Sequence, residues 1–416
     1  MKRAFALLTL AGAALSLTDA VSAQAFGQTR DYVYVETNIK SPNGNSIAGF
    51  VRGSNGQLQP IPGSPFLTGG AGTQDAGISL GPEDSDQDII TNQDHTLLFA
   101  VNSGSDTIAI FHIGGNGELT PVEGSPFPSG GNDPVSVGLS GNTLFVVNKS
   151  GDFGRPSAIL PNYTTFQVAA DGKLTPTSDS TNDSSHRFQS TVSVAVGSSP
   201  SQALVVPDTN LLFGADFLGG LIQRFQFDWN SGIHQLTPLA LPASEFSDTT
   251  TPRLPLGLIN HPRYPLLYVG FVTANKLGVY QYGHDGSLTF IRTVPNSGTA
   301  ICWLRTNRAG TRLYSTDTGT NSVSVYDLSD PENPRQIQNL VLSRPGNVLQ
   351  FSLSGDEKNL YALSSRGSTS IPEGQGNLLH ILTINDDGTV AENVSPVVFN
   401  EPNDTRPQGV AVVPGR

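Results

Sequence analysis

Carboxylates and guanidinium groups are the side chains of this sequence best suited to acid, base or electrostatic catalysis. Three aspartates alternate in the stretch EDSDQD, as Asp84, Asp86 and Asp88. Opening a lactone or another cyclic ester needs a base with a pKa near neutrality and cations that hold the developing oxyanion. On this chemistry we predict catalytic roles for Asp216, His186, Arg155 and Arg253, and substrate binding by Asp88, Asp133, Asp317, Arg344 and Arg406.

Several of these residues also have a purely structural interpretation. Asn102, Asn148, Asp216 and Asp317 recur at the same point of four predicted hairpins, where a short polar side chain commonly bonds its own turn. The alternating aspartates could hold Ca²⁺ through oxygen ligands, but the glycine and closing glutamate of an EF-hand loop are missing, which favours a solvated acidic loop. His186, in the polar stretch STNDSSHRFQS, could equally be an exposed surface residue.

Metal, haem and redox chemistry find little support in the residue types. Of seven histidines only His186 falls in a long predicted loop, while His112, His234 and His380 lie in or beside predicted strands. Cys302 is the single cysteine, so a C-x-x-C motif and an internal disulfide are impossible, and we predict a buried core position for it. A Ser-His-Asp triad could be built only around His186, and no G-x-S-x-G motif is present. We expect neither a bound metal nor another cofactor.

The elements that must position these groups repeat along the chain. The stretch LLFAVNSGSDTIAIFHI reads as two strands joined by a tight polar turn, a pattern typical of a β-hairpin. Six further hairpins match it, and the shortest spacing between anchor residues is the 46 residues from Phe99 to Phe145. The other anchors are Tyr34, Phe213, Tyr268, Tyr314 and Tyr361. A unit of about 40–50 residues with four short strands is typical of a propeller blade.

Inner and outer strands complete each predicted blade. An inner strand precedes each hairpin except the first, as in DIITN or AICWL, and an unmatched inner strand, QGVAVV, ends the chain at Gln408 to Val413. Pairing this last strand with the N-terminal blade would close the ring and remove both sheet edges. We therefore predict an all-β fold, a seven-bladed β-propeller of four-stranded antiparallel blades.

Long connections are predicted to emerge from one face of the ring. The turns between first and second strands and between third and fourth strands are short, so the other face would carry the long segments. These segments are Leu67 to Asp86, Lys149 to Asn162, Asp179 to Gln189, Ala243 to Leu254, Ser365 to Gly376 and Phe399 to Arg406. Because binding residues concentrate in loops on a rigid scaffold, we expect the functional site on that face.

The N-terminal segment and the charge balance bear on location and partners. Residues 1–23 combine Lys2 and Arg3 with an apolar run and small residues, the pattern of a secretory signal peptide cleaved after Ala23 or Ala25. We expect residues 26–416 to form one exported domain, secreted or periplasmic, without membrane insertion and monomeric. The net charge of −12 and the absence of basic clusters argue against a nucleic-acid partner.

The blade sequences also resemble a known family. The stretches LFAVNSGSDTIAIFHIGGNGELTPVEGSPFPSG, PDTNLLFGADFLGGLIQRFQF and AGTRLYSTDTGTNSVSVYDL are similar to those of the seven-bladed lactonase family, which includes 6-phosphogluconolactonases and carboxymuconate cyclases and grades into propellers with Tyr-Val-Thr-Asn repeats. The resemblance implies this fold and a small lactone substrate. It departs at Gln202, where the family has a histidine, and at Thr316-Asp317-Thr318, where a Ser-Asn-Arg signature would be expected.

Two functions from different classes follow. The first is hydrolysis or isomerisation of a small cyclic ester at the loop-bearing face. The second is a non-catalytic propeller that recognises a polysaccharide, a peptide or a protein through the same loops. Loss of the family signature at Gln202 favours the second function, whereas convergence of arginines and aspartates at the channel mouth would favour the first.

Overall fold

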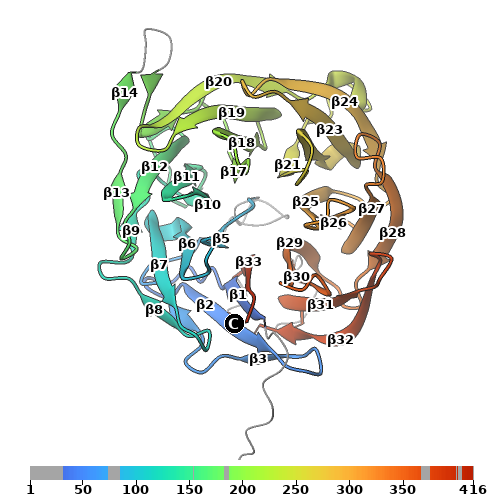
Figure 1. Cartoon of the computed structure of the whole chain (residues 1–416), viewed down its shortest axis with the longest axis horizontal. Coiled ribbons are helices and arrows are strands. Elements are labelled where there is room, and N and C mark those ends of the chain that lie inside the picture. Colours follow the sequence, from blue (N-terminus) through green and yellow to red (C-terminus); the bar gives the residue numbers. More distant parts are fainter. Residues whose placement is uncertain are drawn as a thin grey trace, which may run out of the picture.

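Seven antiparallel sheets surround a central channel in the computed structural model (Figure 1). The structure describes residues 31–73, 85–152, 154–181, 187–366, 375–399, 401 and 405–415. Within these ranges the seven hairpin anchors are at most 1 % exposed, since they stand in the second strand of each blade and pack between neighbouring sheets. The predicted seven-bladed propeller with four-stranded blades is confirmed.

Blades 1 to 3 contain five strands each because the outer strand is broken into two pieces. Blade 1 has β33 (Gln408–Val413), β1 (Tyr32–Glu36), β2 (Ser46–Arg52), β3 (Leu58–Pro60) and β4 (Phe66–Leu67). Blade 2 has β5 (Ile89–Thr91), β6 (Leu97–Asn102), β7 (Thr107–Ile113), β8 (Leu119–Pro121) and β9 (Phe127–Pro128). Blade 3 has β10 (Pro134–Ser140), β11 (Thr143–Asn148), β12 (Asn162–Val168), β13 (Leu174–Pro176) and β16 (Thr191–Ser193).

Blades 4 to 7 each have four strands. Blade 4 has β17 (Leu204–Val205), β18 (Leu211–Asp216), β19 (Leu221–Asp228) and β20 (Gly232–Ala240). Blade 5 has β21 (Pro255–Asn260), β22 (Leu266–Phe271), β23 (Lys276–Tyr282) and β24 (Leu288–Pro295). Blade 6 has β25 (Ile301–Thr306), β26 (Arg312–Asp317), β27 (Ser322–Asp327) and β28 (Arg335–Val341). Blade 7 has β29 (Asn347–Leu353), β30 (Asn359–Ser365), β31 (Leu378–Ile384) and β32 (Val390–Val398).

The helical content of the described residues is limited to single turns. These are the 3-10 helices η1 (Ser103–Ser105), η2 (Ala243–Glu245) and η3 (Val272–Ala274). No described helix has the length and apolar character needed to cross a membrane.

The ring closes through the C-terminal strand, as the sequence predicts. β33 pairs with β1 from Tyr32 opposite Val413 to Glu36 opposite Gln408, and a bulge interrupts the pairing at Gly409. Gly409 has φ +68°, and a Cβ there would lie 3.1 Å from the Asp88 Cβ. Glycine is therefore required twice at this position, by its left-handed backbone and by its close approach to the segment that enters blade 2.

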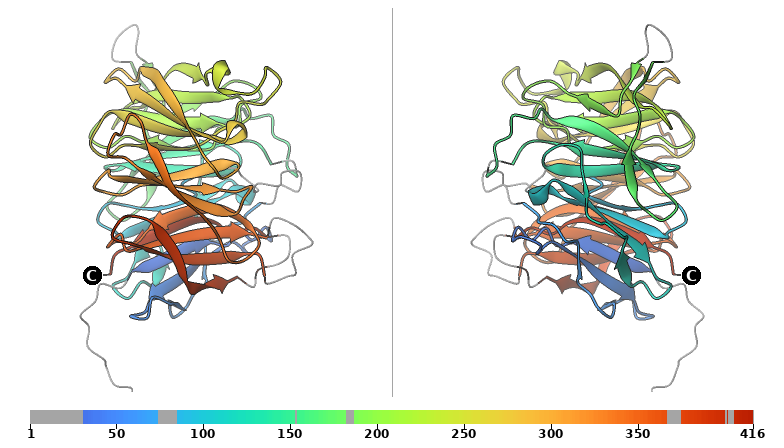
Figure 2. Two further views of the ribbon diagram at one scale, coloured as in Figure 1. Left: turned by 90° about the vertical axis from the view of Figure 1, so that its right-hand side faces the viewer. Right: turned by 90° about the vertical axis from the view of Figure 1, so that its left-hand side faces the viewer.

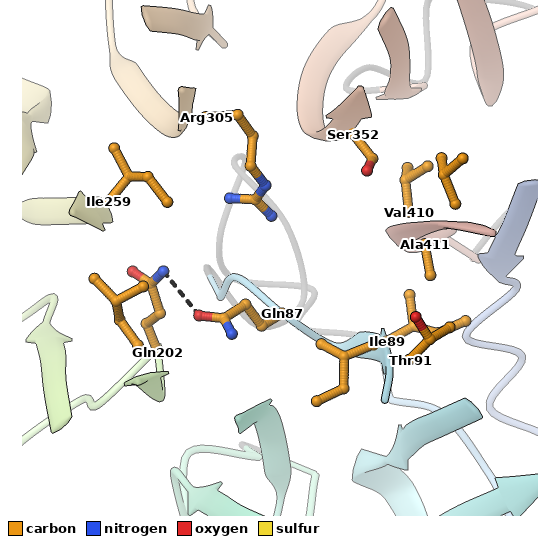
Figure 3. Close-up of a pocket in the computed structure, with 12 residues that line it drawn as sticks. Gln87, Ile89, Thr91, Gln202, Ile259, Arg305, Ser352, Val410 and Ala411 are labelled. Atoms are coloured by element: carbon orange, nitrogen blue, oxygen red, sulfur yellow. Dashed lines mark hydrogen bonds between the residues drawn. The ribbon is translucent and has the colours of Figure 1, made fainter. Parts of the chain in front are cut away.

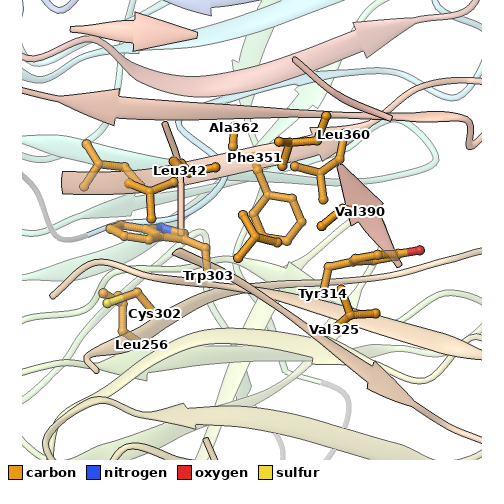
Figure 4. Close-up of a cluster of buried hydrophobic side chains, with 14 of the residues drawn as sticks. Leu256, Cys302, Trp303, Tyr314, Val325, Leu342, Phe351, Leu360, Ala362 and Val390 are labelled. Carbon is orange, nitrogen blue, oxygen red and sulfur yellow. The ribbon is translucent and has the colours of Figure 1, made fainter. Parts of the chain in front are cut away.

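The apolar core is divided among the gaps between adjacent blades. Figure 4 shows the cluster between blades 6 and 7, where Trp303, Tyr314 and Phe351 are at most 1 % exposed. Cys302 lies in the same cluster and is buried, as predicted. A further cluster joins blade 1 to blade 7 and includes Val33 and Tyr361. Each blade thus depends on both neighbours for its burial, and an open ring would expose two apolar sheet faces.

Most of the longer described connections project from one face, and the C-terminal end lies at the other (Figure 2). The segment from Asp179 to Gln189 differs from the prediction. It interrupts the outer strand of blade 3, where β14 (Ser180–Thr181) pairs with β15 (Arg187–Phe188) at the outer edge of the ring (Figure 1). The described ends of this segment therefore lie at the circumference and not at the channel mouth.

Candidate functional site in the central channel

A short segment, Ser85 to Asp88, crosses the channel before blade 2 begins. The Trp303 indole N–H and the Gln350 amide, the latter at 2.9 Å, both donate to the Ser85 carbonyl oxygen. The Asp86 backbone N–H donates to the Ser201 carbonyl oxygen at 2.9 Å. These partners come from blades 6, 7 and 4, so the segment is fixed from across the ring.

An ion pair between Arg305 and Asp86 is the main electrostatic feature of this crossing. Two guanidinium nitrogens each lie 2.7 Å from a different Asp86 carboxylate oxygen, which is the bidentate geometry that arginine favours. The Asp86 side chain is fully buried, whereas that of Arg305 is 22 % exposed. The guanidinium also lies over the Phe351 ring, 5.8 Å from its centroid. Arg305 is thus held rigidly with part of its surface free.

The exposed part of Arg305 lines a cavity of about 260 Å³ inside the channel. Figure 3 shows Arg305 and Gln87 projecting into its centre from opposite sides. Its remaining wall is mostly apolar and consists of Ile89, Ile90, Thr91, Gln202, Leu204, Ile259, Ser352, Val410, Ala411 and Val412. Arg305, Ile259 and Ser352 stand next to the last residue of their inner strands. Because inner strands run from the long-loop face to the short-turn face, the cavity lies towards the short-turn face. The sequence predicts the functional site on the opposite, long-loop face, so this cavity differs from the prediction.

Gln202, the position where the lactonase family has a histidine, fixes the opposite wall. Its amide nitrogen lies 2.9 Å from the Leu258 carbonyl oxygen and 3.0 Å from Gln87 Oε1, and its oxygen accepts the Leu258 backbone N–H at 2.7 Å. A longer contact, 3.3 Å, reaches the Asp86 carboxylate. The Gln202 amide therefore connects this wall of the cavity to Asp86. Unlike a histidine, an amide cannot gain or lose a proton near neutral pH.

Two buried acids lie close to each other, Asp88 at the end of the crossing segment and Glu36 at the end of β1. Asp88 accepts the Ser85 hydroxyl at 2.7 Å and the Gln350 amide at 3.1 Å, and burial raises its pKa to about 7. Burial, together with the nearby Asp88 charge, holds the pKa of Glu36 well above its usual range. The Glu36 Oε2 atom has no hydrogen-bond partner among the described residues. Protonation of these carboxyls removes the repulsion between them, which is why burial and proximity act in the same direction on both pKa values.

Asp88→Asn is expected to flatten the pH dependence of stability. The folded pKa near 7 exceeds the unfolded value of 3.8, so the native state binds more protons between these values and loses stability as pH rises through them. A shift of this size corresponds to an effect on the order of 4 kcal/mol. Urea unfolding at pH 4, 5.5 and 7.5 checks this, and the readout is the slope of the free energy of unfolding against pH. Asp387→Asn serves as an exposed control. If Asp88→Asn has the same slope as the unmodified chain, the pKa assignment is wrong.

The predicted catalytic aspartate and its equivalents serve their own hairpins. Asp216 accepts the backbone N–H groups of Ser199 at 2.7 Å and Gly219 at 3.0 Å, and the Gln223 amide at 3.1 Å. Asp317 accepts hydrogen bonds from side chains within blade 6 and from Asn296 just before it, and burial raises its pKa to about 6. Asn148 bonds the Ser129 carbonyl oxygen and Asn162. The structure favours the structural interpretation of these positions.

The predicted arginines are distributed around the ring. Arg155 binds Asp106 at 3.0 Å and Asp152 at 2.7 Å, and Asp106 also accepts the backbone N–H of Asp133 at 2.8 Å, so these predicted residues share one cluster between blades 2 and 3. Arg253 is half-buried, and its guanidinium lies 3.4 Å from the Leu241 carbonyl oxygen.

Two further arginines lie at other blade junctions. Arg344 follows blade 6, where its carbonyl oxygen accepts from Asn321 at 2.8 Å, and Arg406 precedes β33, where its carbonyl oxygen accepts from Asn38 at 3.3 Å. The arginines are thus held at separate junctions.

Some predicted residues lie outside the described ranges, among them His186 and Asp84. Asp86, the second of the alternating aspartates, gives both carboxylate oxygens to Arg305, which removes it from a calcium site with Asp88. Among the described residues no group of three or more histidine, cysteine, aspartate or glutamate side chains could hold a metal ion.

Sequence reasoning missed Arg305, although a signal was present. Inner strands alternate between side chains that face the channel and side chains that pack between blades. In AICWLRTN, Arg305 is the only charged residue of an otherwise apolar inner strand, and a charge there requires a partner across the channel. That partner, Asp86, could not be identified because it arrives from a connection 219 positions earlier in the chain.

Comparison with solved structures finds the same fold in lactonase-like propellers. A proposed 6-phosphogluconolactonase from Bacteroides fragilis is similar over 96 % of this chain and 100 % of its own, with 15 % identity and a TM-score of 0.65. A second one, from Bacteroides uniformis, gives 16 % identity, coverage of 91 % and 99 %, and a TM-score of 0.64. Periplasmic gluconolactonase from Pseudomonas aeruginosa is similar over 90 % of this chain and 99 % of its own, with 14 % identity and a TM-score of 0.61.

This chain has the fold of those proteins. No protein-family model and no curated protein sequence matches it. At these identities the lactonase-like propellers share the architecture with this chain, and the resemblance seen in the blade sequences is confirmed at that level.

Proposed function

We propose that this lactonase-like propeller binds a small uncharged cyclic ester in the channel cavity and hydrolyses it. The observation that carries the proposal is the Arg305–Asp86 pair, whose guanidinium is both rigidly held and exposed to a partly open cavity lined mostly by apolar residues. A fixed cation in such a space stabilises a developing oxyanion without reorganisation. The gluconolactonase and 6-phosphogluconolactonase names of similar structures support a lactone as the substrate class.

Each residue of the cavity then has a defined role. Arg305 donates to the lactone carbonyl oxygen and stabilises the charge that forms when water attacks the carbonyl carbon. Asp86 keeps the guanidinium oriented. As the tetrahedral intermediate collapses, the ring C–O bond breaks and the proton lost by the attacking water ends on the released ring oxygen, which becomes the hydroxyl of the ring-opened acid. Gln87 and Gln202 offer polar contacts to ring hydroxyls, while Ile259 and Val410 exclude bulk water.

Charge balance argues against a phosphorylated substrate. Arg305 is the only charged side chain among the described residues that line the cavity, and Asp86 neutralises it. A phosphate group would need a second cation to offset its desolvation. We therefore propose a neutral aldonolactone or a similar ester.

A lactone panel tests the proposal. Purified protein is incubated with neutral aldonolactones, a phosphorylated aldonolactone and a muconolactone, and ring opening is followed by proton release. Turnover of a neutral lactone that falls at least about 100-fold in Arg305→Met but not in Arg308→Met is the expected result. Arg308 is an exposed arginine of the same blade with its own partner, Glu357. Equal rates in both variants would overturn the assignment of the cavity.

A second function is binding without catalysis, and one observation favours it. Among the described residues that line the cavity, none is a histidine or a carboxylate, so a base must act from behind the wall. Saturable binding of a lactone or sugar by calorimetry, without a ring-opened product, would establish this function in place of hydrolysis.

We also propose that the mature chain is exported, on the basis of the signal-like residues 1–23. N-terminal sequencing of the protein recovered outside the cytoplasm should start after Ala23 or Ala25. An intact Met1 on the exported protein would contradict cleavage.

A further inference from the structure

The Arg305 guanidinium leaves one of its edges unused. Nη1 donates to the Asp86 carboxylate at 2.7 Å and to the Leu304 carbonyl oxygen at 2.8 Å, and Nη2 donates to the other Asp86 oxygen at 2.7 Å. A guanidinium has five N–H groups, so the Nε–H and the second Nη2–H have no partner among the described residues. Because Asp86 occupies the edge between Nη1 and Nη2, these two N–H groups lie side by side along the edge between Nε and Nη2.

This free edge belongs to a side chain that faces the channel cavity. The Arg305 side chain is 22 % exposed, and Figure 3 shows its guanidinium projecting into the space. Nε is not one of the polar atoms that the fold both encloses and leaves without a partner, so it stays accessible to a ligand. Asp86 and the Phe351 ring already hold the group in place. Binding therefore requires no further ordering of this side chain.

The other polar side chains of the cavity wall also offer mainly hydrogen-bond donors. The amide oxygens of Gln87 and Gln202 are both engaged, by the Gln202 amide nitrogen and the Leu258 backbone N–H. Gln87 Nε2 has one long contact, 3.3 Å to the Val137 carbonyl oxygen, and its second hydrogen has no partner among the described residues. The half-buried Ser352 hydroxyl has none there either. Such a wall is complementary to a ligand that carries paired acceptor oxygens.

We propose that the free edge of Arg305 binds the carboxylate group of small monocarboxylic acids. Two parallel N–H groups match the two oxygens of a carboxylate, which is the bidentate geometry that arginine favours. The hydrocarbon part of the acid lies against the apolar wall formed by Ile89, Ile259 and Val410. Because Asp86 already balances the Arg305 charge, the complex gains one net negative charge and is weak and reversible. A dianion such as sulfate binds more weakly still, since its desolvation is not offset.

Product inhibition follows, and this consequence alone rests on the proposed hydrolysis. Opening a lactone turns the carbonyl that Arg305 contacts into a carboxylate, so the ring-opened acid keeps the guanidinium occupied until it leaves. Other monocarboxylic acids compete with the lactone for the same edge. Butyrate should therefore raise the KM for the lactone without changing kcat.

Titration of the unmodified full chain with two matched ligands tests the carboxylate site. Butyrate and butyramide have nearly the same size and shape, but the amide replaces one acceptor oxygen by an NH2 group, which would face an N–H of Arg305. We expect one butyrate per chain by calorimetry, and at least about tenfold weaker binding of butyramide and of sulfate. In proton–nitrogen correlation spectra, butyrate but not butyramide should shift the Nε–H signal of Arg305, which is assigned by its loss in Arg305→Met.

A lysine variant separates charge from geometry. Arg305→Lys keeps a cation beside Asp86 but lacks the paired N–H groups of the edge, so the affinity for butyrate should fall at least about tenfold. Arg308→Lys makes the same exchange at an exposed arginine of blade 6 and should bind butyrate as the unmodified chain does. Equal affinity for butyrate and butyramide, or an Nε–H signal that butyrate leaves unmoved, would overturn the proposal. Both readouts use the unmodified chain, so they decide even where Arg305→Lys fails to fold.

Binding and turnover can fail separately. Butyrate binding by a chain that opens no lactone supports the carboxylate site and contradicts the proposed hydrolysis. Lactone turnover that depends on Arg305, in a chain that binds no carboxylate, contradicts the carboxylate site alone.

Discussion

Arg305→Met is expected to lower the free energy of unfolding by about 3–5 kcal/mol, because it leaves a buried carboxylate without its countercharge. Asp86 is fully buried and takes its two shortest hydrogen bonds from this guanidinium. The Gln87 backbone N–H at 2.9 Å and the Gln202 amide at 3.3 Å would remain, but neither carries the positive charge that is lost. Urea unfolding at neutral pH, followed by intrinsic fluorescence, measures the effect.

A second substitution separates charge from packing. Arg305→Met/Asp86→Asn removes both charges with little change in volume, and it should regain most of the lost stability. Ligand binding in the channel should stay lost in both variants, since the guanidinium is missing from each. An exposed ion pair contributes no more than about 1 kcal/mol. If Arg305→Met is destabilised by no more than this amount, the Arg305–Asp86 pair does not hold the crossing segment.

A chain that ends at Pro407 is expected to lose cooperative unfolding. The deletion removes β33, and with it three buried apolar residues, Val410, Ala411 and Val413, and the hydrogen bonds to β1. Full burial of an apolar side chain contributes roughly 1.5–3 kcal/mol, so the loss is a large part of the about 5–15 kcal/mol that stabilises a domain. The bare edge of β1 should also promote aggregation. Thermal unfolding followed by circular dichroism and light scattering checks both expectations.

Two controls accompany the truncation. A chain that ends at Val413 keeps the whole strand and should unfold almost as the full chain does. A synthetic peptide of residues 405–416, added to the truncated protein, should bind by strand addition and restore a cooperative transition. A truncated chain that melts cooperatively at the original temperature would show that the ring does not depend on this closure.

The blade architecture could be predicted from the sequence, whereas the site could not. Phe99, Tyr268 and Tyr361 repeat because every second strand must fill the same gap between sheets, and this local demand is visible as a period. The Arg305–Asp86 pair obeys no period, since it joins a strand of blade 6 to a connection before blade 2. Asp216 and Asp317 were chosen as site residues because they are acidic. Their recurrence at the same point of successive hairpins indicated instead that they bond their own turns.

Blade 7 shows the same limit at shorter range, where Ser364, His380 and Glu392 are joined by hydrogen bonds in a buried structural chain. Ser364 pairs with Leu378 and His380 pairs with Ala362 in the ladder, so the two polar residues meet diagonally. A bulge beside His380 then brings in Glu392 from the next strand. Strand alternation indicates which residues share a face, but bulges and diagonal contacts decide which of them touch.

The segment from Ser85 to Asp88 also has a mechanical meaning. Its hydrogen bonds connect the start of blade 2 to blades 4, 6 and 7, which lie across the channel. Separating two neighbouring sheets would therefore strain hydrogen bonds that the segment makes with blades across the channel. The propeller should resist stepwise peeling and give way as a whole.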